Sequence, residues 1–580
     1  MAKFLTSARA VDMLGRQQIA GIPTALSELF KNAYDAYATR VRADYFPTHD
    51  LLLLRDDGIG MSPHDFESRW LTIGTDSKAR GSTAAPLARP PGAPPRTQMG
   101  EKGIGRLAVA SIAPQLVLIT KALTTTHRSR DRAAASAEPL LIALVQWTLF
   151  EIPGLTLDDV VVPVRLVAEP EEVSVELLTS LGDEVRTCLR ELGNRVPDEY
   201  AQRIREELTA FSIDPRQLLS LAGPKYGGDN HGTAFLLSPL NEDLPAALRP
   251  GEGDDKQVSP FQRFLSGFNN TMLPDSPRPA MQPQFILHDA GTEEDLIDPE
   301  KFWSPEDFTR VDHVIQGSFD ERGQFSGSVS VYQGDRQPYT ESWTAGRGRK
   351  SRCGPFRLTI GYLQGSLSDS SVNAEDFTLM TDKLNRLGGI YVYRDDIRVL
   401  PYGNSDVDYL EIEQRRSLKA SRAFFSYRRM FGAIEVSAET NPELQEKAGR
   451  EGFRDNAAYR DFVDILKSLL GNVAADFFVA GGEKSEDWLQ RRTSLKERAS
   501  ARRDDERRQI QQRQAFLDNL ADALNRLESG EVRSELSRVV LDFDKDLRLP
   551  PRVRQRLRPS ASLTAGSTCF APRAFWSDLR

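Results

Sequence analysis

A line of polar side chains on an otherwise apolar helix constrains this chain more than any other feature of its sequence. Residues 21–40, GIPTALSELFKNAYDAYATR, carry apolar residues at helical spacing, with Pro23 in the first turn. Glu28, Asn32 and Asp35 follow at i, i+4 and i+7, which places them on one face. Buried polar groups need partners. Taken alone, the segment fits either a solvated helix face or one side of a ligand site.

A turn rich in glycine comes next, at the end of the short apolar strand LLLLRDD. The carboxylate of Asp56 can accept a hydrogen bond from an exocyclic amine. Gly58 and Gly60 lack a Cβ and tolerate positive φ, so a flat ligand can approach the backbone closely. Asp-Gly is also a frequent turn dipeptide, and a plain hairpin is an equally simple interpretation.

A second glycine segment, GEKGIG, precedes the helical pattern RLAVASIA. Glycines before a helix expose backbone N–H groups that can hold phosphates, and Lys102 adds a positive charge. Residues 79–98, rich in Pro, Ala and Gly, are predicted to form a mobile loop. Before that loop, Thr75, Ser77 and Lys78 either contact phosphates or cap a turn, and both interpretations stay open.

Together and in this order, these segments resemble the GHKL ATPase superfamily, which includes DNA gyrase B, heat-shock chaperones, histidine kinases, MutL and MORC proteins. The closest resemblance is to prokaryotic MORC-like or chaperone-like ATPases. The matching residues are Glu28, Asn32, Asp35 and Ala36 in the first motif, Asp56, Gly58 and Gly60 in the second, Gly100, Gly103 and Gly105 in the lid motif, and Gly232-Thr233 at a late strand.

The resemblance implies an ATP site that contains Mg²⁺. Asn32 would be the metal ligand, Asp56 would accept from the adenine amino group, and Thr233 would support it through water. Glu28 would orient and deprotonate the attacking water. Asp35 is expected to play a supporting structural role. The further nucleotide contacts that we expect are Met61, Thr75, Lys78, Gly100, Lys102, Gly103, Ile104 and Gly105.

Glu28 also separates two activities within the superfamily. Histidine kinases of this fold usually carry Asn at that position and transfer phosphate to histidine. No helical His-Glu segment precedes the ATPase region, and the six histidines are scattered. Hydrolysis, expected to be slow, is therefore favoured over kinase activity.

Residues 285–475 resemble the transducer domain of gyrase-, MutL- and MORC-type ATPases. In those proteins this domain extends a basic residue to the γ-phosphate. The segment KAGRE offers Lys447 and Arg450 for that catalytic role. Ordinary solvated charges before a helix are the alternative.

The predicted fold class is α+β, with four successive parts. These are a two-layer α/β sandwich that binds ATP at 1–280 (lid about 74–105, helical insertion about 170–220), a transducer domain of ribosomal-protein-like fold at 285–475, a charged, coiled-coil-like helical arm at 485–547 and a disordered tail at 548–580.

Composition limits the partners. The net charge of −8 argues against binding of nucleic acid over the whole surface, and local basic patches stay open. Three widely spaced cysteines and the lack of an apolar run of membrane-spanning length indicate a cytoplasmic protein with no membrane partner. We expect an ATP-gated homodimeric clamp in which residues 1–20 reach the partner. Its target is either DNA, bound through basic segments such as 490–514, or a protein client in a defence or stress cassette.

Overall fold

The computed structural model describes most of the first 528 residues. The described ranges are 6–16, 19, 21–73, 89–100, 105–124, 138–209, 211, 213–248, 258–273, 279–418, 424–447 and 452–528. The chain divides into a unit of residues 1–492 and a unit of residues 493–580. Each unit is described by itself.

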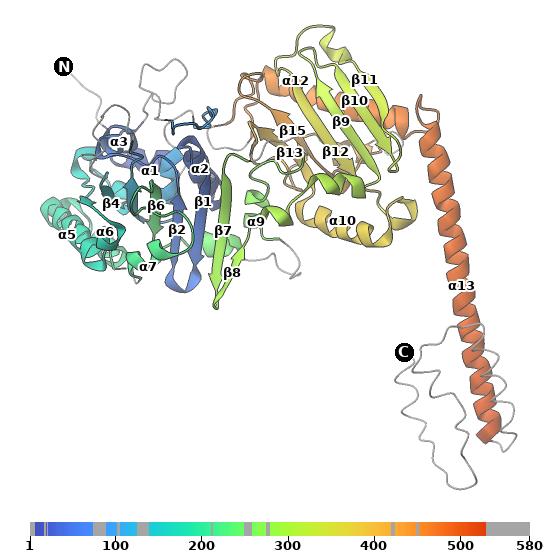
Figure 1. Ribbon diagram of the computed structural model, residues 1–580, viewed down its shortest axis with the longest axis horizontal. Coiled ribbons are helices and arrows are strands. Elements are labelled where there is room, and N and C mark those ends of the chain that lie inside the picture. The colour runs from blue at the N-terminus through green and yellow to red at the C-terminus, as the bar shows by residue number, and fades with distance from the viewer. Residues whose placement is uncertain are drawn as a thin grey trace. The chain divides into compact units, whose positions relative to one another are not determined.

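Eight described strands form the first sheet, in the order β5-β4-β3-β6-β2-β1-β7-β8 (Figure 1). Neighbours are antiparallel except β1 and β7, which run parallel. The strands are β1 (Arg40–Phe46), β2 (Leu51–Asp56), β3 (Gln115–Lys121), β4 (Leu140–Gln146), β5 (Val164–Val167), β6 (Gly232–Leu237), β7 (Gln282–Asp289) and β8 (Thr292–Asp295).

Apolar helices pack on one face of this sheet, which we call the front face; the opposite face is the back face. Leu26 and Phe30 of α2 are fully buried, and the central strands β3 and β4 are buried along their whole length. Such continuous apolar strands require cover on both faces. The elements of the front layer are α1 (Arg9–Gly15), α2 (Ile22–Asp35), the 3-10 helix η4 (Gly105–Ser111), α8 (Asp243–Leu248) and α9 (Pro260–Leu265).

The charged segment expected to be helical covers the back face. It folds as α5 (Val175–Leu192), α6 (Asp198–Glu207) and α7 (Pro215–Ser220). Ser174 caps α5 by accepting from the backbone N–H of Leu177. Arg55 of β2 donates to the carbonyls of Leu221 and Ala222 just after α7. Because side chains alternate along a strand, the next residue, Asp56, faces the front layer.

Two sequence expectations differ from this architecture. The pattern of the apolar run LIALVQWTLFEI predicts strand, but β4 ends at Gln146 and α4 (Thr148–Glu151) follows. Thr148 and Gln146 both donate to the buried carboxylate of Glu207 on α6, which holds the chain in this bend. The expected domain start at residue 285 falls inside β7, because β7 pairs with β1 of the first sheet.

The second sheet belongs to the same unit and begins with β9. Its seven described strands have the order β11-β10-β9-β12-β15-β13-β14, and only β13 and β15 pair in parallel. They are β9 (His313–Phe319), β10 (Phe325–Val331), β11 (Gln337–Glu341), β12 (Phe356–Tyr362), β13 (Gly389–Arg394), β14 (Ile397–Arg398) and β15 (Met430–Val436).

Helices cover both faces of the second sheet. Helix α10 (Ala374–Leu387) packs its Met380 and Leu384 into one apolar cluster with Phe431 of β15. Helix α12 (Ala457–Phe477) covers the opposite face, where Phe462 contacts the ring of Phe356 at 5.1 Å. A short helix, α11 (Ile412–Leu418), lies between β14 and β15 in the chain.

The charged segment near the C-terminus forms one continuous helix. Helix α13 runs from Glu486 to Glu528. The short helix α3, which follows β2 in the chain, is a single turn at Pro63–Asp65. The remainder of the expected arm to residue 547 and the predicted tail at 548–580 lie outside the described residues.

Candidate functional site

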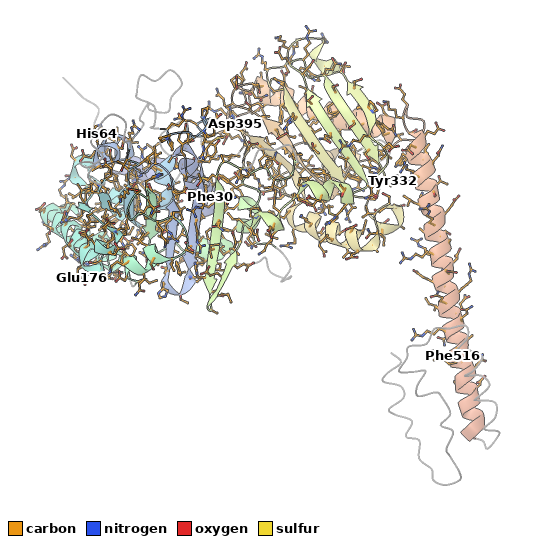
Figure 2. All side chains as sticks on the ribbon, viewed as in Figure 1. Phe30, His64, Glu176, Tyr332, Asp395 and Phe516 are labelled. Carbon is orange, nitrogen blue, oxygen red and sulfur yellow. The ribbon has the colours of Figure 1, made fainter. Side chains whose placement is uncertain are left out.

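The polar line on α2 lies inside the domain. The helix begins after Gly21, whose φ is +89°, and carries Pro in its first turn. Glu28 and Asp35 are only 5% and 4% exposed, and Asn32 is half-buried. A solvated helix face is therefore excluded. Figure 2 labels Phe30, which lies on a different side of the same helix from these three residues.

Asp35 holds the start of the second glycine segment. Its carboxylate accepts from the backbone N–H groups of Met99 and Gly100, at 2.8 and 3.0 Å. Arg96, just before them, donates to the carbonyl of Tyr34 at 3.0 Å and lies 4.9 Å from the centre of that ring. A cation at the C-terminal end of a helix is favourable. These contacts fix the stretch before the glycines to the end of α2.

The other end of the glycine segment lies against Glu28 and Asn32. A Cβ added at Gly105 would come within 2.9 Å of Glu28 Oε2 and 3.9 Å of the Asn32 amide. The first distance is too short for any larger residue without displacement of the carboxylate. Both described ends of the segment thus meet one face of one helix.

The turn after β2 requires its glycines for close packing. A Cβ at Gly60, whose φ is +60°, would lie 1.9 Å from the carbonyl oxygen of Lys121. Ile59 donates to the carbonyl of Ala36 at the end of α2, at 2.8 Å. The chain continues from here to α3, so the turn does not close a hairpin with the next strand. The hairpin interpretation is therefore wrong.

Asp56 is a buried carboxylate held by backbone amides. The backbone N–H of Gly58 donates to its Oδ1 at 2.8 Å. Burial raises the pKa of Asp56 to about 7, although the backbone N–H groups of Gly58 and Thr233 act to lower it. An amine donor from a ligand would stabilise the charged form further. The side chain is thus suited to accept such a donor.

Thr120 is a site residue that the sequence reasoning missed. Its Oγ1 lies 3.1 Å from Oγ1 of Thr233 and accepts from the backbone N–H of Met61 at 2.9 Å. It therefore ties the late strand to the Asp56 turn. A threonine near the end of the apolar run QLVLITK was the available signal, but its partners are distant in the chain.

The structure places Glu28, Asn32 and Asp35 on α2, with Gly105 of η4 against Glu28 and Asn32. At the end of β2 it brings Asp56, Gly58, Gly60 and Met61 next to Thr233 of β6. Helix α2 and the turn are joined through the Ile59–Ala36 bond. Thr75, Lys78, Lys102, Gly103, Ile104 and Arg450 lie outside the described residues. Lys447 is described: its backbone N–H donates to the carbonyl of Gly452 at 2.9 Å.

These residues fit a nucleotide with a metal ion. The side-chain oxygen of Asn32 is a suitable Mg²⁺ ligand when phosphates and waters complete the set. Within the described ranges, no group of three or more His, Cys, Asp or Glu side chains could hold a metal by itself. A metal here would therefore depend on a bound phosphate for most of its ligands.

Comparison with known proteins agrees with this geometry. Residues 21–148 match the family described as histidine kinase-, DNA gyrase B-, and HSP90-like ATPase. The matched range includes α2, the Asp56 turn, both ends of the glycine segment and Thr120. The search among curated proteins gave no match.

One negative finding concerns membranes. Among the helices that the structure describes, none combines the length and the apolar character needed to cross a bilayer.

The family match and the site geometry concern the first domain. Residues 21–148 are accordingly similar to the ATPase domain of the histidine kinase-, DNA gyrase B-, and HSP90-like family, and this similarity supports ATP binding.

Proposed function

We propose that this chain binds ATP with Mg²⁺ and hydrolyses it slowly. The observation that carries the proposal is the meeting of Glu28, Asn32 and Gly105, because it joins a carboxylate, an amide oxygen and the end of a glycine segment. The family match supports ATP binding and ATP hydrolysis at the level of the superfamily. Turnover, dependence on Mg²⁺ and the roles of individual residues are our proposals.

Each residue has one task in this mechanism. Bound ATP with Mg²⁺ supplies the phosphoanhydride bond and the positive charge that offsets the phosphates. Glu28 orients a water molecule and accepts its proton, and Asn32 gives its side-chain oxygen to the metal. Asp56 accepts from the adenine amino group with support from Thr233. The backbone N–H groups of Gly100–Gly105 bind phosphate oxygens.

The decisive experiment separates binding from turnover. Glu28→Gln keeps the shape of the side chain but removes the base, so turnover should fall about 10²- to 10⁴-fold while ATP affinity stays within a few-fold. The control is Glu176→Gln on α5 of the back layer, where the side chain is exposed. Turnover at the wild-type rate in Glu28→Gln would exclude Glu28 as the base.

The proposed output is an ATP-gated dimer. Nucleotide binding would close the lid, engage Lys447 or Arg450 with the γ-phosphate and join two protomers through residues 1–20. A mass measurement with and without a non-hydrolysable ATP analogue tests this. A monomer under both conditions would contradict the clamp, and Lys447→Ala beside Arg450→Ala would identify the sensor.

DNA is the target that we favour, because the basic charge of α13 is concentrated on one side. Residues 491–514 contain nine basic and four acidic side chains. At 100° per residue, eight of the nine basic residues fall on one half of the helix, while Arg508 shares the other half with Glu497, Asp504 and Asp505. A one-sided basic helix suits a row of phosphates.

The charge distribution also provides the control for DNA binding. Replacing Arg498, Arg502 and Arg503 by Gln should weaken binding of duplex DNA and reduce its salt dependence, whereas Arg508→Gln should have a smaller effect. An ATPase assay with and without DNA gives the functional readout. DNA-independent turnover together with a co-purifying protein would favour a chaperone-like or signalling ATPase that acts on a protein client.

A further inference from the structure

Lys31 is a buried cation beside the proposed catalytic base. It is 4% exposed, and its Nζ lies 3.6 Å from Glu28 Oε1 and 3.4 Å from Glu446 Oε2. A buried ammonium group is costly unless carboxylates compensate its charge, and removal of one partner from such a group is strongly destabilising. Lys31 therefore connects Glu28 of the first domain to a carboxylate of the second.

Glu446 moves with the second sheet, because its segment is bound on both sides. The backbone N–H of Lys447 donates to the carbonyl of Gly452, and Glu446 and Phe453 pair as the two arms of a hairpin. Just before it, the carbonyl of Leu444 accepts from Arg394 of β13 at 2.9 Å. A shift of the second sheet would carry the Glu446 carboxylate with it.

A ring contact and an electrostatic interaction lie on the flank of α2 next to Lys31. The ring of Phe30 packs edge-on against Phe268 at 5.7 Å, and the carbonyl of Phe268 accepts from the backbone N–H of Arg398 of β14 in the second sheet at 2.9 Å. Tyr34, one turn later, is close enough to Asp395 for that carboxylate to raise its pKa, after the larger effect of burial. Figure 2 labels Phe30 on α2 and Asp395 directly after β13. This flank of α2 is thus the docking surface for the second domain.

The side chains of α2 form two sides, one toward the proposed nucleotide site and one toward the second domain. At 100° per residue, Glu28, Asn32 and Asp35 share one side, and Phe30 and Tyr34 share another. Lys31 falls between the two sides. It can therefore contact Glu28 on the nucleotide side and Glu446 on the docking side at the same time.

We propose that Lys31 is a positioning residue that holds the Glu28 carboxylate in place only while Glu446 of the second domain is docked. When Glu446 withdraws, the ammonium group loses one of its two carboxylates and its long side chain is no longer held between them. Glu28 then loses the fixed cation that orients it. This inference rests on the proposed function of Glu28 and makes turnover depend on domain docking.

The first test replaces only the second-domain carboxylate. In Glu446→Gln, kcat should fall about 10- to 100-fold, the scale expected for a misplaced catalytic group, with KM for ATP nearly unchanged. Amide hydrogen exchange of residues 441–447 in the nucleotide-free protein should become faster. The matched control is Glu443→Gln in the same segment, because Glu443 is exposed. Wild-type kcat together with wild-type exchange in Glu446→Gln would overturn the proposal.

A charge exchange distinguishes this contact from general damage to the fold. Lys31→Glu and Glu446→Lys should each lose turnover and protection of the hairpin, and the double variant should recover part of both. Lys31→Arg should keep more of both than Lys31→Met. A double variant no better than its parents would contradict the contact. If the wild-type protein shows no turnover, the proposed function fails, and hydrogen exchange alone still decides whether Lys31 docks Glu446.

Discussion

Arg55 and Asp56 are neighbours on β2, yet their side chains lie on opposite faces of the first sheet and in opposite electrostatic surroundings. On the back face, Arg55 donates to Asp44 at 2.9 Å, and both side chains are fully buried. Arg42 and His288 also contact Asp44, at 2.9 and 2.8 Å. On the front face, the described contacts of the Asp56 carboxylate are with backbone N–H groups.

The pKa values of the two buried carboxylates accordingly shift in opposite directions. Burial alone would raise the pKa of Asp44, but hydrogen bonds from Arg42, His288 and Arg55 hold it below its usual value. Burial raises the pKa of Asp56 to about 7 because neutral amides compensate it less. A buried carboxylate with internal cations stabilises the fold, whereas a buried carboxylate whose charge is incompletely compensated is suited to a ligand.

The largest loss of stability that we predict comes from removing the charge of Asp44, which binds Arg42, Arg55 and His288 on the back face. Asp44→Asn keeps the shape but leaves two buried guanidinium groups facing a neutral amide, which should cost about 3–5 kcal/mol of unfolding free energy. Chemical denaturation measures this loss. Glu293→Gln, at the exposed margin of the same cluster, should cost less than about 1 kcal/mol. Equal losses in the two variants would contradict the role given to burial.

Asp56→Asn should affect ligand affinity and leave stability intact. The amide loses the negative charge and one of the two acceptor oxygens that the carboxylate offers to adenine, so ATP affinity should fall about 10- to 100-fold, or about 1–3 kcal/mol. Stability at neutral pH should hold or rise, because an incompletely compensated buried charge is removed. ATP titration and denaturation of the same samples test both statements. Unchanged affinity would exclude a role for the Asp56 charge in accepting from adenine.

The pH dependence of stability should have opposite signs for the two faces. Asp56 titrates at about 7 when folded and about 4 when unfolded, so between these values the native state holds more protons and its stability falls as pH rises. Asp44, with its lowered pKa, contributes stability above the unfolded value and loses it as pH falls.

Unfolding of wild type and Asp56→Asn at several pH values checks this sign. The advantage of Asp56→Asn over wild type should grow from about pH 4 to about pH 7 and then level off. A constant difference over this range would show that Asp56 is ionised at low pH in the folded protein.

The smallest effect concerns the link between the late strand and the Asp56 turn. Thr120→Val keeps the shape but removes the hydroxyl that bonds Met61 and Thr233, at a cost of about 1 kcal/mol. ATP affinity should fall a few-fold in a titration. An effect as large as that of Asp56→Asn would mean that Thr120 contacts the nucleotide directly.

Much of the first domain was open to prediction because its signals are local. The spacing of Glu28, Asn32 and Asp35 defines a helix face whatever surrounds it. The glycines of the Asp56 turn indicate a close backbone approach for the same reason. The superfamily assigned from these segments is confirmed by the family match to residues 21–148. The transducer assignment, the individual roles and the clamp stay predictions.

The expectations that failed depended on partners far away in the chain. The strand predicted through WTLFEI ends early because Glu207, about 60 residues later, binds Gln146 and Thr148. The boundary near 285 fell inside β7 because pairing with β1 cannot be read from an isolated strand. Periodicity reports which face of an element is apolar and gives no information about its neighbour.

By itself, the sequence determined that a helix with three aligned polar residues and two glycine segments occur in the order of an ATP-binding domain. Only the tertiary structure decided that Thr120 joins Thr233 and that Arg55 and Asp56 face opposite layers. It also decided that Lys31 lies between Glu28 and Glu446. The physical reason is the distance along the sequence over which each effect acts. Backbone geometry fixes the spacing of side chains within one helix or strand, whereas a buried charge is compensated by residues that meet only when the chain folds.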